Sequence, residues 1–154
     1  MFQILPLPYA PFAHLFALTD DDLAARRARR VVADGFPGFP CRVSLEDAQP
    51  GETLVLVHHT HQSAESPYHA SHAVYVRAGA NEACPAPGEV PPVLLRRPIS
   101  LRAFDAAGMM RAADLAEGEA VGPAIECLLA ISEAAEVHLH NAKPGCYAAR
   151  VVRA

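Results

Sequence analysis

"EVHLHNAKPGCYAARVVR", residues 136–153, consists of two segments of alternating polarity around a Pro-Gly pair. In its first half, Glu136, His138 and His140 alternate with apolar residues, which is the period of a strand with two different faces. Proline presets the first central position of a tight turn, and glycine accepts the positive φ that the second position needs. The stretch therefore predicts a C-terminal β-hairpin, and it points to a fold built on an antiparallel sheet.

Pro-Gly pairs punctuate the whole chain in the same way, at 37–38, 50–51, 87–88 and 144–145. Between these turns, apolar and β-branched runs predict further strands. The predicted strands are 2–5, 30–33, 41–48, 53–60, 72–79 and 99–110, the last entering a turn at Ala107–Gly108 before a returning strand. We expect 41–48 and 53–60 to pair as a hairpin across "QPGE", and the Pro-rich segment 81–92 to be a connection.

Two stretches read as helices. Thr19 is a suitable N-cap, and the three aspartates after it fill a first turn, so a helix is predicted over 20–29. The segment 119–131 is amphipathic, with Ile125, Leu128 and Leu129 on one face. About seven or eight strands and two helices define an α+β class, mainly antiparallel sheet, in a single domain over residues 1–154.

Composition narrows the classes of partner. The 154 residues are 51% hydrophobic, enough for a core without metals or disulfides. The net charge is −4, which argues against a nucleic-acid binder, and the basic run 26–30 is expected to be a solvated helix end. The apolar N-terminus is interrupted by prolines and lacks a basic start, so a signal peptide and a membrane span are not expected. The prediction is a cytoplasmic protein.

The four cysteines form no C-x-x-C pair, so neither a zinc ribbon nor a thioredoxin-like motif is indicated. In a cytoplasmic protein they are expected to be reduced. Cys127, within "IECLLAI", is predicted to be a small core residue. Cys146 is a candidate reactive thiol, provided that a neighbouring group activates it.

The stretch "HHTHQSAESPYHASH", residues 58–72, holds five histidines. Strand alternation places His58 and His59 on opposite faces, so they cannot act together. His69 lies in a turn-forming polar loop and is expected to be exposed. His61 directly follows a strand end, which is where functional residues concentrate.

His138 and His140 share one face of their strand, and H-x-H is a spacing that zinc ligands use. Such a site needs another protein ligand, either His61 or a carboxylate. Alternatively, both histidines are hydrogen-bonded residues on a half-buried sheet face.

Cys146 follows the predicted turn closely, but hairpin geometry disfavours it as the third ligand. If the loop has an even number of residues, Cys146 lies on the face of Asn141. His140 then shares its face with Tyr147 and Ala149. Only an odd loop or a bulge would bring Cys146 round to the histidines.

A second polar set begins at "PCRVSLED". In the predicted strand, Arg42 and Ser44 face opposite to Cys41, Val43 and Leu45. An arginine in this setting can bind a carboxylate or phosphate with two hydrogen bonds. The alternative is a structural ion pair with Glu46, Asp47 or another acid.

Five segments in this order resemble the DUF1203 family of small bacterial proteins: "ARRVVAD", "GFPCRVSLEDAQPGE", "HQSAESPYHAS", "SLRAFDAAGMM" and "HLHNAKPGCYAARV". The resemblance covers almost the whole chain and implies a fold group but no activity. The residues that match the family pattern are Cys41, Arg42, His61, Gln62, Pro67, Tyr68, Ser71, His138, His140, Asn141, Gly145 and Cys146. The other histidines of the 58–72 stretch depart from it.

Three functional hypotheses follow, and whether the protein is an enzyme stays open among them. The first is a pocket for a small polar or anionic ligand, lined by Arg42, His61, Tyr68, Ser71, His138, His140 and Asn141. The second is a metal protein with His138, His140 and His61 as ligands. The third is a non-enzymatic interaction module or homodimer that pairs through an open sheet edge.

Overall fold

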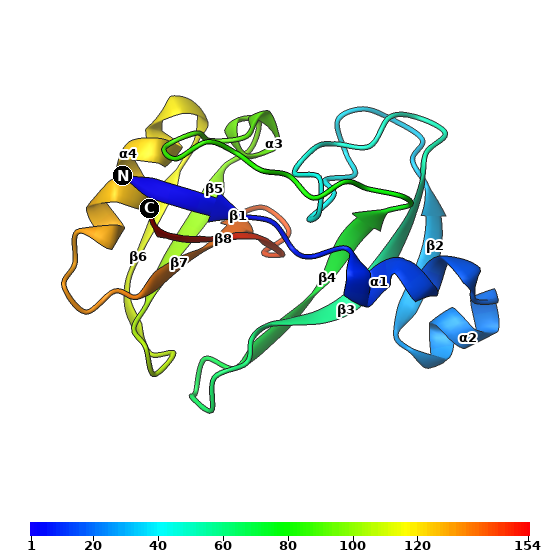
Figure 1. Ribbon diagram of the computed structural model, residues 1–154, viewed down its shortest axis with the longest axis horizontal. Coiled ribbons are helices and arrows are strands. Elements are labelled where there is room, and N and C mark those ends of the chain that lie inside the picture. Colours follow the sequence, from blue (N-terminus) through cyan, green and yellow to red (C-terminus); the bar gives the residue numbers. More distant parts are fainter.

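The computed structural model describes residues 1–154 and contains eight strands in two antiparallel sheets (Figure 1). The strands are β1 (Phe2–Leu5), β2 (Ala28–Val32), β3 (Thr53–Gln62), β4 (Ala70–Arg77), β5 (Ile99–Phe104), β6 (Met110–Ala116), β7 (Glu136–Asn141) and β8 (Tyr147–Arg153). One sheet has the order β1-β8-β7-β5-β6, and the other has the order β2-β3-β4. The predicted α+β class and the C-terminal hairpin are confirmed.

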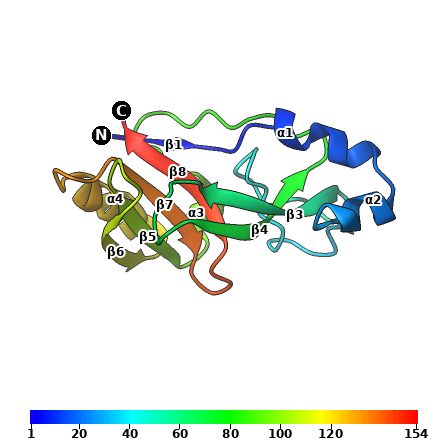
Figure 2. The same cartoon turned by 90° about the horizontal axis from the view of Figure 1, so that it is seen from below.

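Four short α-helices accompany the sheets: α1 (Ala10–Ala13), α2 (Asp20–Ala25), α3 (Pro92–Leu95) and α4 (Val121–Leu129). The helix α4 packs on the five-stranded sheet, whereas α1 and α2 lie beside the three-stranded sheet at the other end of the molecule (Figures 1 and 2). Both chain termini lie beside α4, because β1 and β8 pair there. None of the helices is long and apolar enough to cross a membrane.

The predicted hairpin of 41–48 with 53–60 is wrong. Both edges of β3 are already occupied, by β2 and β4, so no position is left for another strand. Residues 41–48 form turns instead, with an isolated bridge from Pro40 to Asp47 and a positive φ of 50° at Leu45. Arg42 therefore does not lie on a strand, and its side chain is buried.

Two smaller predictions also need correction. The helix expected over 20–29 ends at Ala25, because Arg27 takes a φ of 53° and the following residues pair with β3 as strand β2. The first two residues of the basic run 26–30 therefore form a turn, and the other three belong to β2. Cys127 is exposed, since it lies about 200° around α4 from the buried Ile125.

A bulge shapes the C-terminal hairpin. Leu139 pairs with Ala149 but His140 pairs with Tyr147, so Ala148 is the extra residue. Tyr147 shares the face of His140 as predicted, whereas Ala149 turns to the opposite face, with Leu139. The bulge lies beyond Cys146 along β8, so this cysteine stays beside Asn141, as an even loop predicts.

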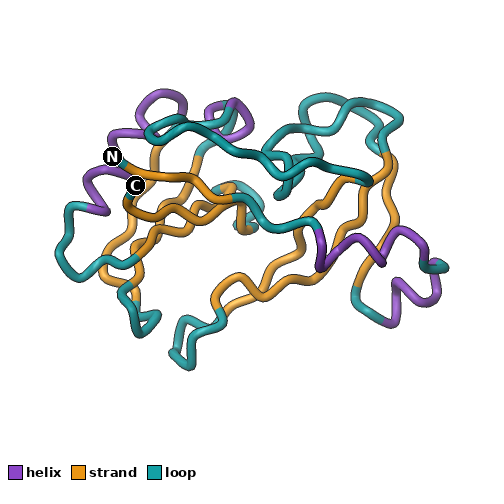
Figure 3. The backbone as a smooth tube through the Cα atoms, viewed as in Figure 1, coloured by secondary structure: helices purple, strands orange, loops and turns teal.

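Two apolar cores flank the functional region. The larger core lies between α4 and one face of the five-stranded sheet, and it includes Leu101, Ile125 and Leu139. The second lies against the three-stranded sheet and includes Tyr147 of β8. Long loops also connect the two sheets (Figure 3). In one of them, the 78–91 connection, the Pro85 carbonyl accepts a hydrogen bond from Gln3 of β1 at 2.7 Å.

Candidate functional site

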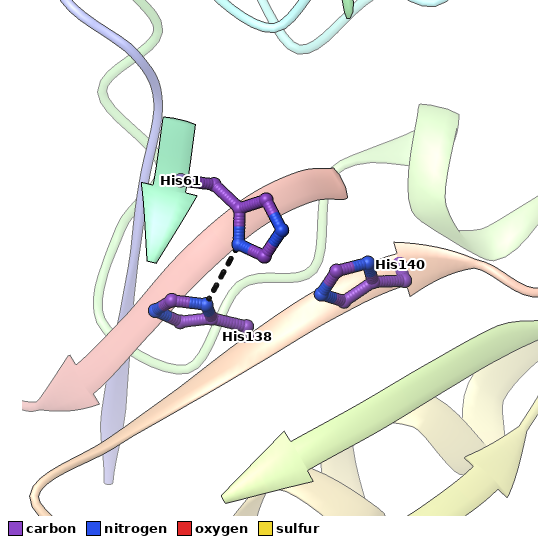
Figure 4. A group of neighbouring side chains, drawn as sticks. All are labelled: His61, His138 and His140. Carbon is purple, nitrogen blue, oxygen red and sulfur yellow. Dashed lines mark hydrogen bonds between the residues drawn. The ribbon is translucent and has the colours of Figure 1, made fainter. Parts of the chain in front are cut away.

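Three histidines from two different sheets meet at the boundary between them. His61 comes from the end of β3, and His138 and His140 come from β7 (Figure 4). One ring nitrogen of each residue lies within 4.8 Å of the others. His138 and His140 are almost completely buried, with 1% and 0% of their surface exposed.

Strand geometry explains this convergence. On β7, Val137 and Leu139 enter the core under α4, so His138 and His140 emerge together on the other face. On β3, Thr60 pairs with Ser71 and Gln62 pairs with Ala70, so the pairing skips the histidine between them. A bulge re-aims the side chain of its extra residue, and here it turns His61 toward β7.

Neighbouring acceptors fix the orientation of the two β7 rings. The Nε2 atom of His138 lies 2.9 Å from a Glu136 carboxylate oxygen, so Nε2 carries the proton and Nδ1 keeps its lone pair. The Nδ1 atom of His140 lies 3.1 Å from the Gly145 carbonyl oxygen, so here Nε2 keeps the lone pair. That Nε2 atom is buried and has no hydrogen-bond partner.

The ring of His61 lies close to that of His138. His61 Nδ1 lies 3.3 Å from His138 Nδ1, and His61 Nε2 lies 3.0 Å from His72 Nδ1. Two nitrogens bound to one tetrahedral zinc ion, each about 2.05 Å from it, are about 3.3 Å apart. The spacing between His61 and His138 therefore fits a shared metal ion, and His72 is placed to orient the His61 ring.

The surroundings keep the imidazoles of His61 and His140 neutral. Burial, aided by the neighbouring His140, lowers the pKa of His61 to about 3. Burial, aided by the positive charge of Arg102, lowers the pKa of His140 to about 3. Neutral rings have the lone pairs that a metal ligand needs.

The remaining contacts enclose the site. The Tyr147 ring stacks on His61 with centroids 4.9 Å apart, and burial raises the pKa of its hydroxyl, so it stays protonated. The hydrogen bond from His138 lowers the pKa of Glu136, which keeps that carboxylate charged. A charged carboxylate behind a histidine is the usual outer partner of a metal ligand.

The other residues predicted for a single pocket lie elsewhere. Arg42 donates to the Tyr147 carbonyl at 2.8 Å, to Cys146 Sγ at 2.9 Å and to the Pro40 carbonyl. Asn141 donates to the same sulfur at 3.4 Å, so these side chains form a second polar cluster around Cys146. The alternative of an Arg42 ion pair is wrong, since no carboxylate contacts this guanidinium.

Tyr68 and Ser71 belong to neither cluster. Tyr68 is 38% exposed, with its ring 6.0 Å from that of Phe104. The Ser71 hydroxyl hydrogen bonds to Thr60 across the β3–β4 pair at 2.8 Å. His69 is exposed on the loop, as predicted. Of the residues named for the single pocket, the three histidines therefore form one cluster and Arg42 and Asn141 belong to another.

Sequence reasoning missed Arg102. It lies opposite His138 in the β5–β7 register, its side chain makes no hydrogen bond or ion pair, and its charge helps to lower the pKa of His140. Alternation within "ISLRAF" places Arg102 on one face of a strand, but only the pairing of β5 with β7 brings it beside the histidines. The contact of His72 with His61 was missed because it depends on the β3–β4 pairing, whereas Glu136 shares the His138 face by alternation alone.

The fold and the site define an α+β protein of two antiparallel sheets with a three-histidine cluster between them. The family model described as "Protein of unknown function (DUF1203)" matches residues 38–153, and the chain belongs to this family. No curated protein and no solved structure matches the chain. The resemblance stated from the sequence segments is thereby confirmed, and the family adds no activity to it.

Proposed function

We propose that the protein binds a divalent transition-metal ion through His61, His138 and His140. The observation that carries the proposal is the buried Nε2 atom of His140, which has no partner and belongs to the cluster. Buried polar atoms nearly always have a hydrogen-bond partner. A bound cation would supply the missing partner of His140 Nε2, which lies close to ring nitrogens of His61 and His138. Imidazole ligands suit zinc, copper, nickel and iron.

A simpler account is a hydrogen-bonded chain without metal. His72 could donate to His61, His61 to His138, and His138 to Glu136, because each contact is within hydrogen-bond distance. These hydrogen bonds would account for the contacts among His72, His61, His138 and Glu136, but they leave His140 Nε2 without a partner. A metal ion would also give His140 Nε2 a partner, which is why we favour the metal site.

Three protein ligands leave one position of a tetrahedral ion open, which is the pattern of catalytic rather than structural zinc sites. When bound, such an ion polarises water or a ligand oxygen at the open position. The chain itself would orient the ligands through Glu136 and the Gly145 carbonyl, and Tyr147 would cover one side of the His61 ring.

The experiment is a calorimetric zinc titration of untagged protein that has been stripped with a chelator, followed by elemental analysis. We expect one equivalent of zinc in the natural protein and a loss of at least about 100-fold in affinity in His140→Gln, because a ligand is removed. His58→Gln is the matched control, since His58 is exposed and outside the cluster, and it should bind normally. Binding below about 0.1 equivalents, or equal affinity in both variants, would overturn the proposal.

A further inference from the structure

The largest cavity of the molecule lies apart from the three-histidine cluster. It has a volume of about 800 Å³ and forms where residues 37–42, strands β3 and β4, and the β7–β8 turn meet. Four of its lining residues are cationic, namely Arg42, Arg96, Arg97 and Lys143. None of the lining residues is acidic, although the chain as a whole carries a net charge of −4.

Only one carboxylate compensates these charges. Arg96 and Arg97 both contact Asp47, which is buried behind the wall, and the Arg96 contact is 3.5 Å long. Arg42 and Lys143 have no acidic partner. Four cations against one carboxylate leave an excess of three positive charges, a field that attracts small anions into a concave site.

A thiol also lines this cavity. Cys146 is half-buried, and its sulfur accepts hydrogen bonds from Arg42 at 2.9 Å and Asn141 at 3.4 Å. An arginine beside sulfur is the setting in which cysteines are reactive. The buried guanidinium is held by two backbone carbonyls as well, so its position relative to the sulfur is fixed.

We infer that this cavity binds a small organic anion, carrying a carboxylate or a phosphate group, and presents the Cys146 thiol to it. Lys143 and the half-exposed Arg96 supply the charges that a ligand can reach, while Arg42 holds the thiol. The inference does not depend on the metal ion. The two sites share only the His72 side chain, which lines the cavity and contacts His61.

Alkylation with an anionic and a neutral reagent tests this inference within one molecule. The sulfur attacks the methylene carbon of iodoacetate or iodoacetamide, a carbon–sulfur bond forms, and iodide leaves with the bonding pair while the thiol proton passes to the buffer. The rate of alkylation at each cysteine is measured by peptide mass spectrometry, with a metal chelator present throughout. The exposed Cys84 and Cys127 are internal references.

We expect the ratio of the iodoacetate rate to the iodoacetamide rate to be at least about tenfold higher at Cys146 than at the reference cysteines, because the cavity concentrates anions. The double variant Lys143→Gln/Arg96→Gln should lose this preference, and inorganic phosphate should reduce it in the natural protein. Arg29→Gln, which removes a charge outside the cavity, should leave it unchanged.

Equal ratios at all three cysteines would overturn the inference. So would a preference that survives the double variant. If Cys146 is inert to both reagents while Cys84 and Cys127 react to completion, the cavity does not present the thiol and the inference fails. A protein that binds no zinc but shows the predicted ratio would sink the metal proposal alone.

Discussion

At the scale of single residues, Glu136 orients one histidine of the proposed metal site. Its carboxylate accepts from His138 Nε2 at 2.9 Å and is contacted by Arg150 at 3.4 Å. The His138 hydrogen bond is also the main reason why the Glu136 pKa is lowered. The carboxylate thereby favours the His138 tautomer whose Nδ1 would be available to the proposed ion.

Glu136→Ala should therefore weaken zinc binding by about 10- to 100-fold without removing any ligand, which is the usual effect of deleting an outer partner. Competition with a fluorescent zinc chelator measures the change. Glu133→Ala is the control, because Glu133 is exposed and bonds only to Ser132. An unchanged affinity in Glu136→Ala would show that Glu136 does not orient a metal ligand.

At the scale of elements, the hairpin that carries His61 is braced by another turn. The β5–β6 turn touches the β3–β4 loop at Gly108, whose carbonyl accepts from Ser66 Oγ at 2.9 Å. A Cβ atom placed on Gly108 would lie 2.3 Å from Ala64 Cβ, and the glycine also has a φ of +75°. Figure 1 shows the two turns side by side at the lower edge of the molecule.

Gly108→Ala should destabilise the protein by about 2–3 kcal/mol, since it adds both backbone strain and a steric clash. Gly88→Ala is the matched control. Its φ of +83° gives similar strain, but nothing lies within 4 Å of the added atom, so about 1 kcal/mol is expected. Urea denaturation compares the two variants, and equal losses would mean that the contact between the turns contributes nothing.

Short-range patterns predicted the elements that depend on short-range chemistry. The C-terminal hairpin, the turn at Gly108 and the buried face of α4 all follow from alternation, turn residues and helical spacing. The segment 41–48 has the same alternation, yet long-range competition for the edges of β3 excludes it from the sheet. Periodicity cannot reveal which partner a strand takes.

The candidate site was likewise predicted only where it depends on local patterns. The shared face of His138 and His140 could be read from their spacing, but His61 reaches them through a bulge that no local pattern marked. Arg102 lies opposite His138 only because of the β5–β7 register. The single pocket proposed from sequence becomes two clusters because Arg42 turns inward to Cys146, away from the imidazoles.

At the scale of the whole molecule, the proposed metal links two sheets that have separate cores. His61 belongs to the three-stranded sheet, whereas His138 and His140 belong to the five-stranded one. A ligand that binds only the folded state stabilises it by a free energy that grows with the logarithm of the ratio of its concentration to its dissociation constant. Because the proposed ligands come from both sheets, the ion should stabilise the whole chain against unfolding.

Zinc at 100 times its dissociation constant should raise the free energy of unfolding by about 2.7 kcal/mol. Denaturant titrations with and without zinc measure this difference, and chelator should reverse it. His140→Gln should show no stabilisation at the same zinc concentration. A natural protein with the same free energy of unfolding in zinc and in chelator would contradict a metal held between the sheets.

The most direct test of a metal ion held by these three histidines is anomalous diffraction at the zinc absorption edge from crystals of the zinc-treated protein. One strong peak is expected about 2.0–2.1 Å from His61 Nδ1, His138 Nδ1 and His140 Nε2. No peak between these three nitrogens, or zinc bound only to other histidines such as His58 or His69, would contradict it.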